Sequence, residues 1–277
     1  RRNLIINGAM QVAQRGTSET GVTSGGYKQA PDRWRIYMSS AGTWTVSQSS
    51  TAPDGFSQSY KFDCTTADAS LSAGDYARLT QNIEGNNLSS LKKGTSSAQS
   101  LTLSFWVRSA KTGTYICEIE DDDNGRHISQ AYTISAADTW EHKSLTFAGD
   151  TSGALTIDNS RALQINWWLA AGTTYTSGTL ATAWASDTNA NRAVGQVNLA
   201  DSTSNDWYMT GVQLEVGENA SDFEHRSYGE ELTLCQRYYY RIGEAVVSSN
   251  AQFTLQGRSL SSNRTDGTLM LPSPMRA

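Results

Sequence analysis

The chain has 277 residues, enough for one large domain with a smaller unit beside it, or for two domains. Its formal net charge is −5 and no basic run is present, which disfavours nucleic-acid binding because phosphates must be neutralised by clustered Lys and Arg. No apolar run approaches the ~18 residues of a membrane-spanning helix and no signal peptide is apparent, so membrane insertion is not expected.

Charged residues make up 18% of the chain, below the roughly 25% of an average domain, while the aromatic residues include 8 Trp and 12 Tyr. A polar, weakly charged and aromatic-rich chain suits an extracellular β-protein that contacts sugars. The alternative is that most of these aromatic side chains fill the core of a sandwich. The odd number of cysteines, Cys64, Cys117 and Cys235, argues against a disulfide framework and a zinc site.

Short apolar alternations separated by turn residues predict many strands and almost no helix before Ser227. The predicted strands lie near 3–7, 33–38, 43–49, 58–64, 76–83, 100–109, 114–120, 130–134, 142–147, 154–157, 162–170, 194–199 and 207–216. This pattern predicts a mainly β fold, an antiparallel jelly-roll β-sandwich over residues 1–222. A junction helix in 223–241 and the start of a C-terminal β-unit in 242–277, with strands near 244–255 and 268–271, are predicted to follow.

Two predicted strands illustrate how the core is expected to form. Alternate residues from Leu101 to Val107 share one face, as do Tyr115, Cys117 and Ile119. We expect these segments to pair as a hairpin with Val107 opposite Tyr115 and with Gly113 at positive φ. Trp106 then lies on the outer face.

Residues 118–125 form the only dense acidic run of the chain. Asp121 and Asp123 are weak candidates for holding Ca²⁺, although the Glu that closes an EF-hand loop is missing. A solvated acidic hairpin tip is the favoured alternative, and no cofactor is expected.

The strand at 163–169 offers a candidate sugar-binding face. Leu163, Ile165, Trp167 and Leu169 alternate with Gln164, Asn166 and Trp168. Amides can bond sugar hydroxyls while an indole stacks on the apolar face of a pyranose, so these three residues and Trp106 are candidate carbohydrate-binding residues. Tyr175 and Trp184, in the long polar loop 171–192, complete the set. The alternatives are a strand that faces solvent or a subunit, and a Trp184 that folds back to cap the sandwich.

The segment 207–241 combines a strand with a helix. Tyr208, Thr210, Val212, Leu214 and Val216 are expected to share one face of a half-buried strand. Ser227 and Glu230 form a capping box that predicts a helix to about residue 241. Its last residues, Tyr238, Tyr239 and Tyr240, point in different directions and are candidates for an oligomer interface. The alternative is that the helix plugs one end of the sandwich.

Two segments resemble known families. The motifs GVQLEVG and DFEHRSYGEELTLCQRYY, within residues 211–239, and the opening Asn3–Met10 with the later Asp32-Arg-Trp34, resemble tail-fibre and other appendage proteins of tailed bacteriophages. The opening is also similar to that of jelly-roll carbohydrate-binding modules. Such modules often hold structural calcium between their first and last strands, but the matching positions 9–11 and 210–213 are not acidic here.

The resemblance implies a virion appendage protein that binds a host surface glycan without catalysis. It also implies other virion proteins as partners and a homo-oligomer, with a trimer expected. The second hypothesis is a structural head-fibre, decoration or connector protein without sugar binding. A glycan-degrading enzyme is the third, and is less favoured because the sequence has no nucleophile motif, metalloprotease motif or phosphate loop.

Overall fold

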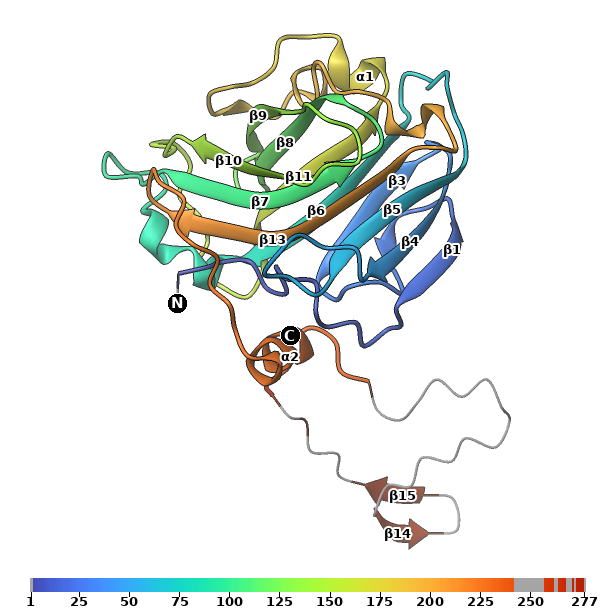
Figure 1. Cartoon of the computed structure of the whole chain (residues 1–277). Coiled ribbons are helices and arrows are strands. Elements are labelled where there is room, and N and C mark those ends of the chain that lie inside the picture. The colour runs from blue at the N-terminus through green and yellow to red at the C-terminus, as the bar shows by residue number, and fades with distance from the viewer. Residues whose placement is uncertain (1, 242–256, 262–263, 268–270, 272, 277) are drawn as a thin grey trace.

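The computed structural model describes residues 2–241, 257–261, 264–267, 271 and 273–276. Two antiparallel sheets face each other and enclose one hydrophobic core, which confirms the predicted mainly β sandwich (Figure 1). The six-stranded sheet has the order β1 (Ser18–Val22), β4 (Thr43–Ser49), β5 (Ser59–Thr66), β13 (Asp206–Val216), β7 (Leu101–Ser109) and β10 (Glu141–Phe147). The seven-stranded sheet has the order β12 (Ala185–Ser186), β9 (Arg126–Ile134), β8 (Gly113–Asp121), β11 (Arg161–Ala171), β6 (Tyr76–Glu84), β3 (Trp34–Ser39) and β2 (Gly26–Tyr27).

The helices are short. They are α1 (Thr173–Thr176), α2 (Tyr228–Gln236) and the single 3₁₀ turns η1 (Gly85–Asn87), η2 (Ser89–Leu91), η3 (Asn189–Asn191) and η4 (Leu199–Asp201). Within the described part of the chain, none is long or apolar enough to cross a membrane. β14 (Gly257–Ser261) and β15 (Arg264–Gly267) pair antiparallel. The predicted strand at 244–255 and most of that at 268–271 lie outside the described residues.

The core is built from inward-facing aromatic and aliphatic side chains of both sheets. The Trp167 ring of β11 packs edge-on against Trp34 of β3, with ring centroids 5.4 Å apart, and against Phe105 of β7 at 5.9 Å. Because these rings are fully buried and come from both sheets, they fix how the sheets stack.

The predicted hairpin between 101–107 and 115–119 is wrong. β7 pairs with β10 and β13, whereas β8 pairs with β9 and β11 in the other sheet. The apolar faces of both strands nevertheless meet in the core, and Gly113 has φ of +129° as expected. The alternation shows which face is buried, but two facing strands satisfy it as well as two neighbouring strands do.

The predicted face of 207–216 also needs correction. Trp207 and Met209 face the core before a bulge, and Val212 and Leu214 face it afterwards, while Tyr208 lies on the outer face. The bulge falls at Gly211, whose φ is +61°. The extra residue in the bulge moves every later side chain to the opposite face. A prediction that assumes strict alternation is therefore wrong beyond the bulge.

Replacing Gly211 with alanine tests the bulge. An alanine here would adopt a left-handed conformation, and its Cβ would lie 2.6 Å from the Phe56 ring. We expect a loss of about 1–3 kcal/mol of unfolding free energy, measured by urea denaturation. Gly21→Ala is the matched control, because its φ is +69° and nothing lies within 4 Å of the added Cβ. Equal losses in both variants would show that the Phe56 contact contributes nothing.

Three predicted strands, 3–7, 154–157 and 194–199, have no strand conformation, and the sequence did not predict β1, β2, β12, β14 or β15. In the first segment, side chains replace the sheet partner. The Asn3 Oδ1 atom accepts from the Ile5 amide at 2.9 Å, and Asn7 Oδ1 accepts from the Val12 amide at 3.0 Å. Such local bonds compete with ladder pairing.

The junction helix begins as predicted and ends earlier. The Ser227–Glu230 capping box is present, but α2 stops at Gln236 rather than near residue 241. Figure 1 shows α2 outside the sandwich, near the region where the chain starts. Glu231 of the helix accepts a hydrogen bond from the Asn7 amide at 2.5 Å, and Cys235 packs with Ile6 and Val12. The opening of the chain therefore holds the helix against the sandwich.

Candidate functional site

The polar face predicted on β11 exists but is covered. Gln164, Asn166 and Trp168 lie on the outer face of the seven-stranded sheet, with exposed fractions of 3%, 0% and 1%. The segment of residues 172–197, called here the covering segment, folds over this part of the sheet. Trp168 packs under Tyr175, Leu180 and Ala193. The expected open face for a sugar is therefore buried.

Glu118 is the centre of the network beneath the covering segment. Its carboxylate accepts hydrogen bonds from Arg192 Nε at 2.7 Å, Asn166 Nδ2 at 3.0 Å and Trp168 Nε1 at 3.1 Å, and lies 3.0 Å from His127 Nδ1. Arg192 belongs to the covering segment, so this ion pair fastens the segment to the sheet. Arg192 also reaches Glu120 at 2.5 Å.

The charge state of Glu118 follows from these contacts. Burial alone would raise its pKa, but the charge of Arg192, hydrogen bonds from His127 and Arg192, and the charge of Arg78 hold the pKa at about 2. A general acid for glycoside cleavage needs a raised pKa. A carboxylate with a lowered pKa that is bound by two arginines suits a structural role.

The other predicted sugar-binding residues are dispersed. Tyr175 is half-buried above Trp168, with ring centroids 5.2 Å apart. Trp184 is also half-buried, because its ring folds back so that Nε1 donates to the Ala148 carbonyl at 2.7 Å. Trp106 lies on the outer face of the other sheet, beside His142. The structure therefore does not bring the six predicted residues into one site.

Carboxylates of the acidic run already bind other groups of this chain. Asp121 is buried and pairs with Lys93 Nζ at 2.5 Å, while Asp123 is exposed and accepts from the Thr156 amide at 2.8 Å. In the described residues, no group of three or more His, Cys, Asp or Glu side chains is arranged to hold a metal ion. The turn between β8 and β9 exposes residues 123–125, as expected for a solvated hairpin tip, whereas the Asp121 carboxylate is buried in an ion pair.

A groove of about 520 Å³ opens at the opposite edge of the seven-stranded sheet. It lies beside β2, β3 and the start of β11, and its lining is Tyr27, Arg35, Asn82, Asp122, Asp123, Arg161 and Arg276. Arg35 packs on the ring of Tyr37, which in turn accepts a hydrogen bond from Arg161 at 3.0 Å. The Asp122 carboxylate pairs with Arg161 and accepts from Gln164 Nε2 at 2.9 Å. The groove thus combines charged donors and acceptors with one accessible aromatic ring, since Tyr27 is 39% exposed.

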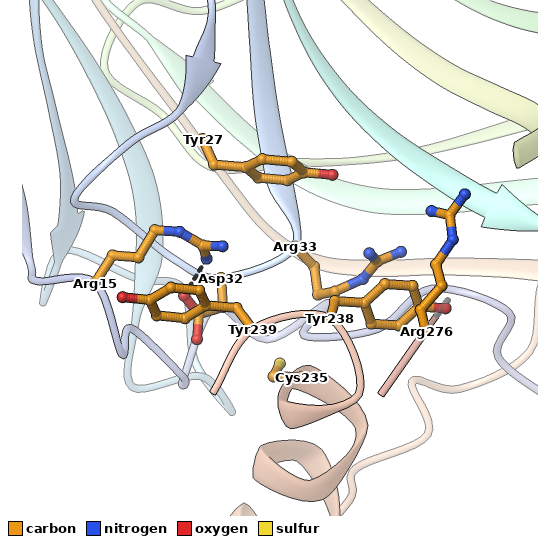
Figure 2. A pocket seen from close by; sticks show the side chains of 8 residues that line it. All are labelled: Arg15, Tyr27, Asp32, Arg33, Cys235, Tyr238, Tyr239 and Arg276. Atoms are coloured by element: carbon orange, nitrogen blue, oxygen red, sulfur yellow. Dashed lines mark hydrogen bonds and ion pairs between the residues drawn. The ribbon is translucent and has the colours of Figure 1, made fainter. Parts of the chain in front are cut away.

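A second cavity adjoins this groove, because Tyr27 and Arg276 line both. Figure 2 shows Arg15, Arg33, Tyr238 and Tyr239 gathered in it around the end of α2. The first two residues of the predicted oligomer interface therefore contact their own chain: Tyr238 lies 3.3 Å from Arg33 and Tyr239 3.6 Å from Arg15, measured from ring centroid to guanidinium carbon. Both tyrosines lie beyond the end of α2, which stops earlier than predicted. Tyr240 is half-buried.

Sequence reasoning did not identify the groove. Arg161 lies far along the chain from Tyr27 and Arg35, and none of the three belongs to a recognisable motif. The only local signal was Gly25-Gly26 before Tyr27, which is typical of a turn rather than of a binding site.

No protein-family model and no curated protein matches the chain. Several solved structures have a similar fold. One is a putative sugar binding protein from Bacteroides thetaiotaomicron, which is 14% identical to this chain. The match covers 78% of this chain and 100% of that chain, with a TM-score of 0.41. The module TmCBM61 in complex with beta-1,4-galactotriose matches at 11% identity, over 78% of this chain and 99% of that one, with a TM-score of 0.39. The enzymatically active domain of bacteriophage CBA120 tailspike protein 4 matches at 16% identity and a TM-score of 0.38. The match covers 77% of this chain but only 21% of the tailspike chain.

Proposed function

We propose that this protein is an appendage protein of a tailed-phage virion that binds a host surface glycan in the Tyr27 groove without cleaving it. The observation that carries the proposal is the exposed Tyr27 ring at the meeting point of two cavities lined by hydrogen-bonding side chains. Sugar recognition needs such a pairing, because a pyranose has one apolar face and a rim of hydroxyls.

The size and composition of the groove fit a saccharide. Ligand pockets usually enclose ~300–1,000 Å³ and contain a few fixed polar groups, and the groove volume of about 520 Å³ lies in that range. Arg161 and Asp122 hold each other in place, and Arg35 is held by Tyr37. Side chains fixed in this way lose little entropy when a ligand binds.

The absence of catalysis is supported by the state of the buried carboxylates. Glu118 and Glu120 share the donors Arg192 and Asn166, and Glu118 keeps a low pKa. In the groove, the Asp122 carboxylate is already paired with Arg161. Glu118 and Asp122 are thus each already bound to an arginine.

The assignment to a phage appendage rests on the opening segment and on the 211–239 segment, which resemble such proteins. The proposed setting is the virion, with other virion proteins as neighbours. A trimer would strengthen weak single-site binding through multivalency, and sedimentation analysis of the full chain measures its oligomeric order.

Replacing Tyr27 with alanine tests the proposed site. We expect binding to intact host cells, and to the positive spots of a glycan array, to weaken at least about tenfold, because the stacking surface is lost. The fold should persist, since the ring is exposed at a sheet edge. Tyr228→Ala is the matched control, because Tyr228 is 56% exposed and lies at the start of α2. Unchanged binding by Tyr27→Ala, or no glycan bound by the wild type, would reject the proposal.

One surface favours a second function, that of a structural connector without sugar binding. Trp106 packs on His142 with ring centroids 5.2 Å apart, and Trp140 packs on Tyr208 at 6.1 Å, all on the outer face of the six-stranded sheet. Trp106 and Trp140 are half-buried there, and aromatic side chains that keep some exposure are common at subunit contacts. Loss of assembly in Trp106→Ala, together with normal cell binding by Tyr27→Ala, would support the connector function.

A further inference from the structure

The cavity beside the groove has the chemistry of an anion site. Its volume is about 310 Å³, and it lies between the opening of the chain and the residues that follow α2. It is lined by Arg15, Tyr27, Asp32, Arg33, Cys235, Tyr238, Tyr239 and Arg276, which contribute three guanidinium groups and one carboxylate (Figure 2).

Arg33 is a buried cation without an acidic partner. Only 4% of the residue is exposed. Its Nη2 atom donates to the Asn82 carbonyl at 2.7 Å, while its Nε atom has no hydrogen-bond partner. Among the described residues, no carboxylate oxygen lies within ion-pair distance of its guanidinium group. A buried charge in this condition carries a large desolvation penalty, which a bound anion would offset.

The remaining charges of the cavity do not neutralise Arg33. Asp32 pairs with Arg15 at 3.1 Å. Glu84 pairs with Arg237 at 2.9 Å and lies 3.9 Å from Arg276. Burial lowers the pKa of Arg33, a direction expected when no opposite charge compensates its desolvation.

Aromatic side chains also place two of the guanidinium groups. The Arg15 guanidinium lies between two rings, 3.6 Å from the Tyr239 centroid and 5.1 Å from that of Tyr27. Arg33 lies against Tyr238 (Figure 2). Cation–π contacts of this kind orient an arginine but leave donors along its edge free for an oxyanion.

We propose that this cavity binds a carboxylate or phosphate group of an acidic glycan whose sugar ring occupies the adjoining groove. This inference rests on the proposed function and names the class of its ligand. Tyr27 and Arg276 line both spaces, so one ligand can place a ring against Tyr27 and its anionic substituent near Arg33. Bidentate hydrogen bonds from arginine to an oxyanion are short and directional, so they would favour an acidic sugar over its neutral counterpart.

The experiment is an NMR titration of the full chain with glucuronate, glucose, glucose 6-phosphate and inorganic phosphate. We expect glucuronate or glucose 6-phosphate to bind at least tenfold more tightly than glucose. The stronger of the two identifies the carboxylate or the phosphate as the preferred anion. Arg15→Gln should reduce that preference at least tenfold.

Arg108→Gln is the matched control, because Arg108 also lies over a tyrosine, Tyr208, and pairs with an aspartate, Asp138, on the other sheet. Arg276→Gln provides a second variant that leaves the Arg15–Asp32 pair intact. Equal binding of glucuronate, glucose 6-phosphate and glucose, or no binding of any of them, would overturn the inference.

The failures of the two proposals can be distinguished. Neutral glycans bound through Tyr27, with no acidic preference, would leave the proposed function standing and remove the anion site. Tight binding of inorganic phosphate that depends on Arg15, with no glycan bound on the array, would retain an anion site but reject its glycan ligand and the proposed function.

Discussion

Replacing Glu118 with glutamine is expected to cost about 3–5 kcal/mol of unfolding free energy, because two arginines and a histidine remain buried around a neutral side chain. The residue keeps its shape, so the loss reports the charge rather than a cavity. Since Arg192 belongs to the covering segment, this segment should open first, and amide hydrogen exchange across residues 172–197 should accelerate. Urea denaturation measures the total effect.

Asp138→Asn is the control for that substitution. Asp138 pairs with Arg108 at 2.9 Å, but its side chain is 57% exposed, so its loss should change stability by less than about 1 kcal/mol. Similar losses in the two variants would show that the buried network contributes no more than a surface pair.

The same residue predicts a pH dependence. The pKa of Glu118 is about 2 in the folded protein and near 4.5 ordinarily, so the unfolded chain binds the proton more readily. The contribution of Glu118 is therefore present above about pH 4.5 and is lost as the pH falls towards 2. Unfolding free energy measured across this window should fall less steeply in Glu118→Gln than in the wild type. An unchanged slope would contradict the low pKa.

Replacing Trp168 with alanine is expected to destabilise the protein by about 3–5 kcal/mol, because the side chain is fully buried and its removal leaves a cavity. It also removes the hydrogen bond that Nε1 donates to Glu118. Thermal or urea denaturation measures the loss. Any weaker glycan binding should appear only under conditions in which the covering segment has opened.

Trp168→Phe narrows the comparison, since it keeps a six-membered aromatic ring and removes the indole donor together with the smaller ring that carries it. Its expected cost is about 1–3 kcal/mol. A Trp168→Ala variant that stayed as stable as the wild type but lost glycan binding would contradict this account and restore Trp168 as a contact residue for the sugar.

β11 shows how much of the fold local pattern could predict. Leu163, Ile165 and Trp167 face the core as expected, because side chains alternate across a strand whatever its neighbours are. The partner strands could not be predicted in the same way. The core side of β7 is complementary to several strands, and the choice between pairing with β8 and facing it depends on the whole set of strands.

The candidate site was harder to predict, for a related reason. Gln164, Asn166 and Trp168 have the residue types of a sugar-binding face, but residue type does not reveal that a segment after the strand folds back over them. Tyr27 gave no signal, and Arg33 stood in the Asp32-Arg-Trp34 motif without pointing to a cavity, because the cavity they line depends on where α2 and the residues after it settle.

The sequence by itself determined the mainly β class, the buried faces of most strands and the capped start of α2, since each depends on contacts within a few residues. The tertiary structure alone decided the strand order, the face reversal at Gly211, the burial of the Glu118 network and the meeting of Arg15, Arg33 and Tyr238. These features depend on contacts between residues far apart in the chain, and their energies belong to the packed arrangement rather than to any local segment.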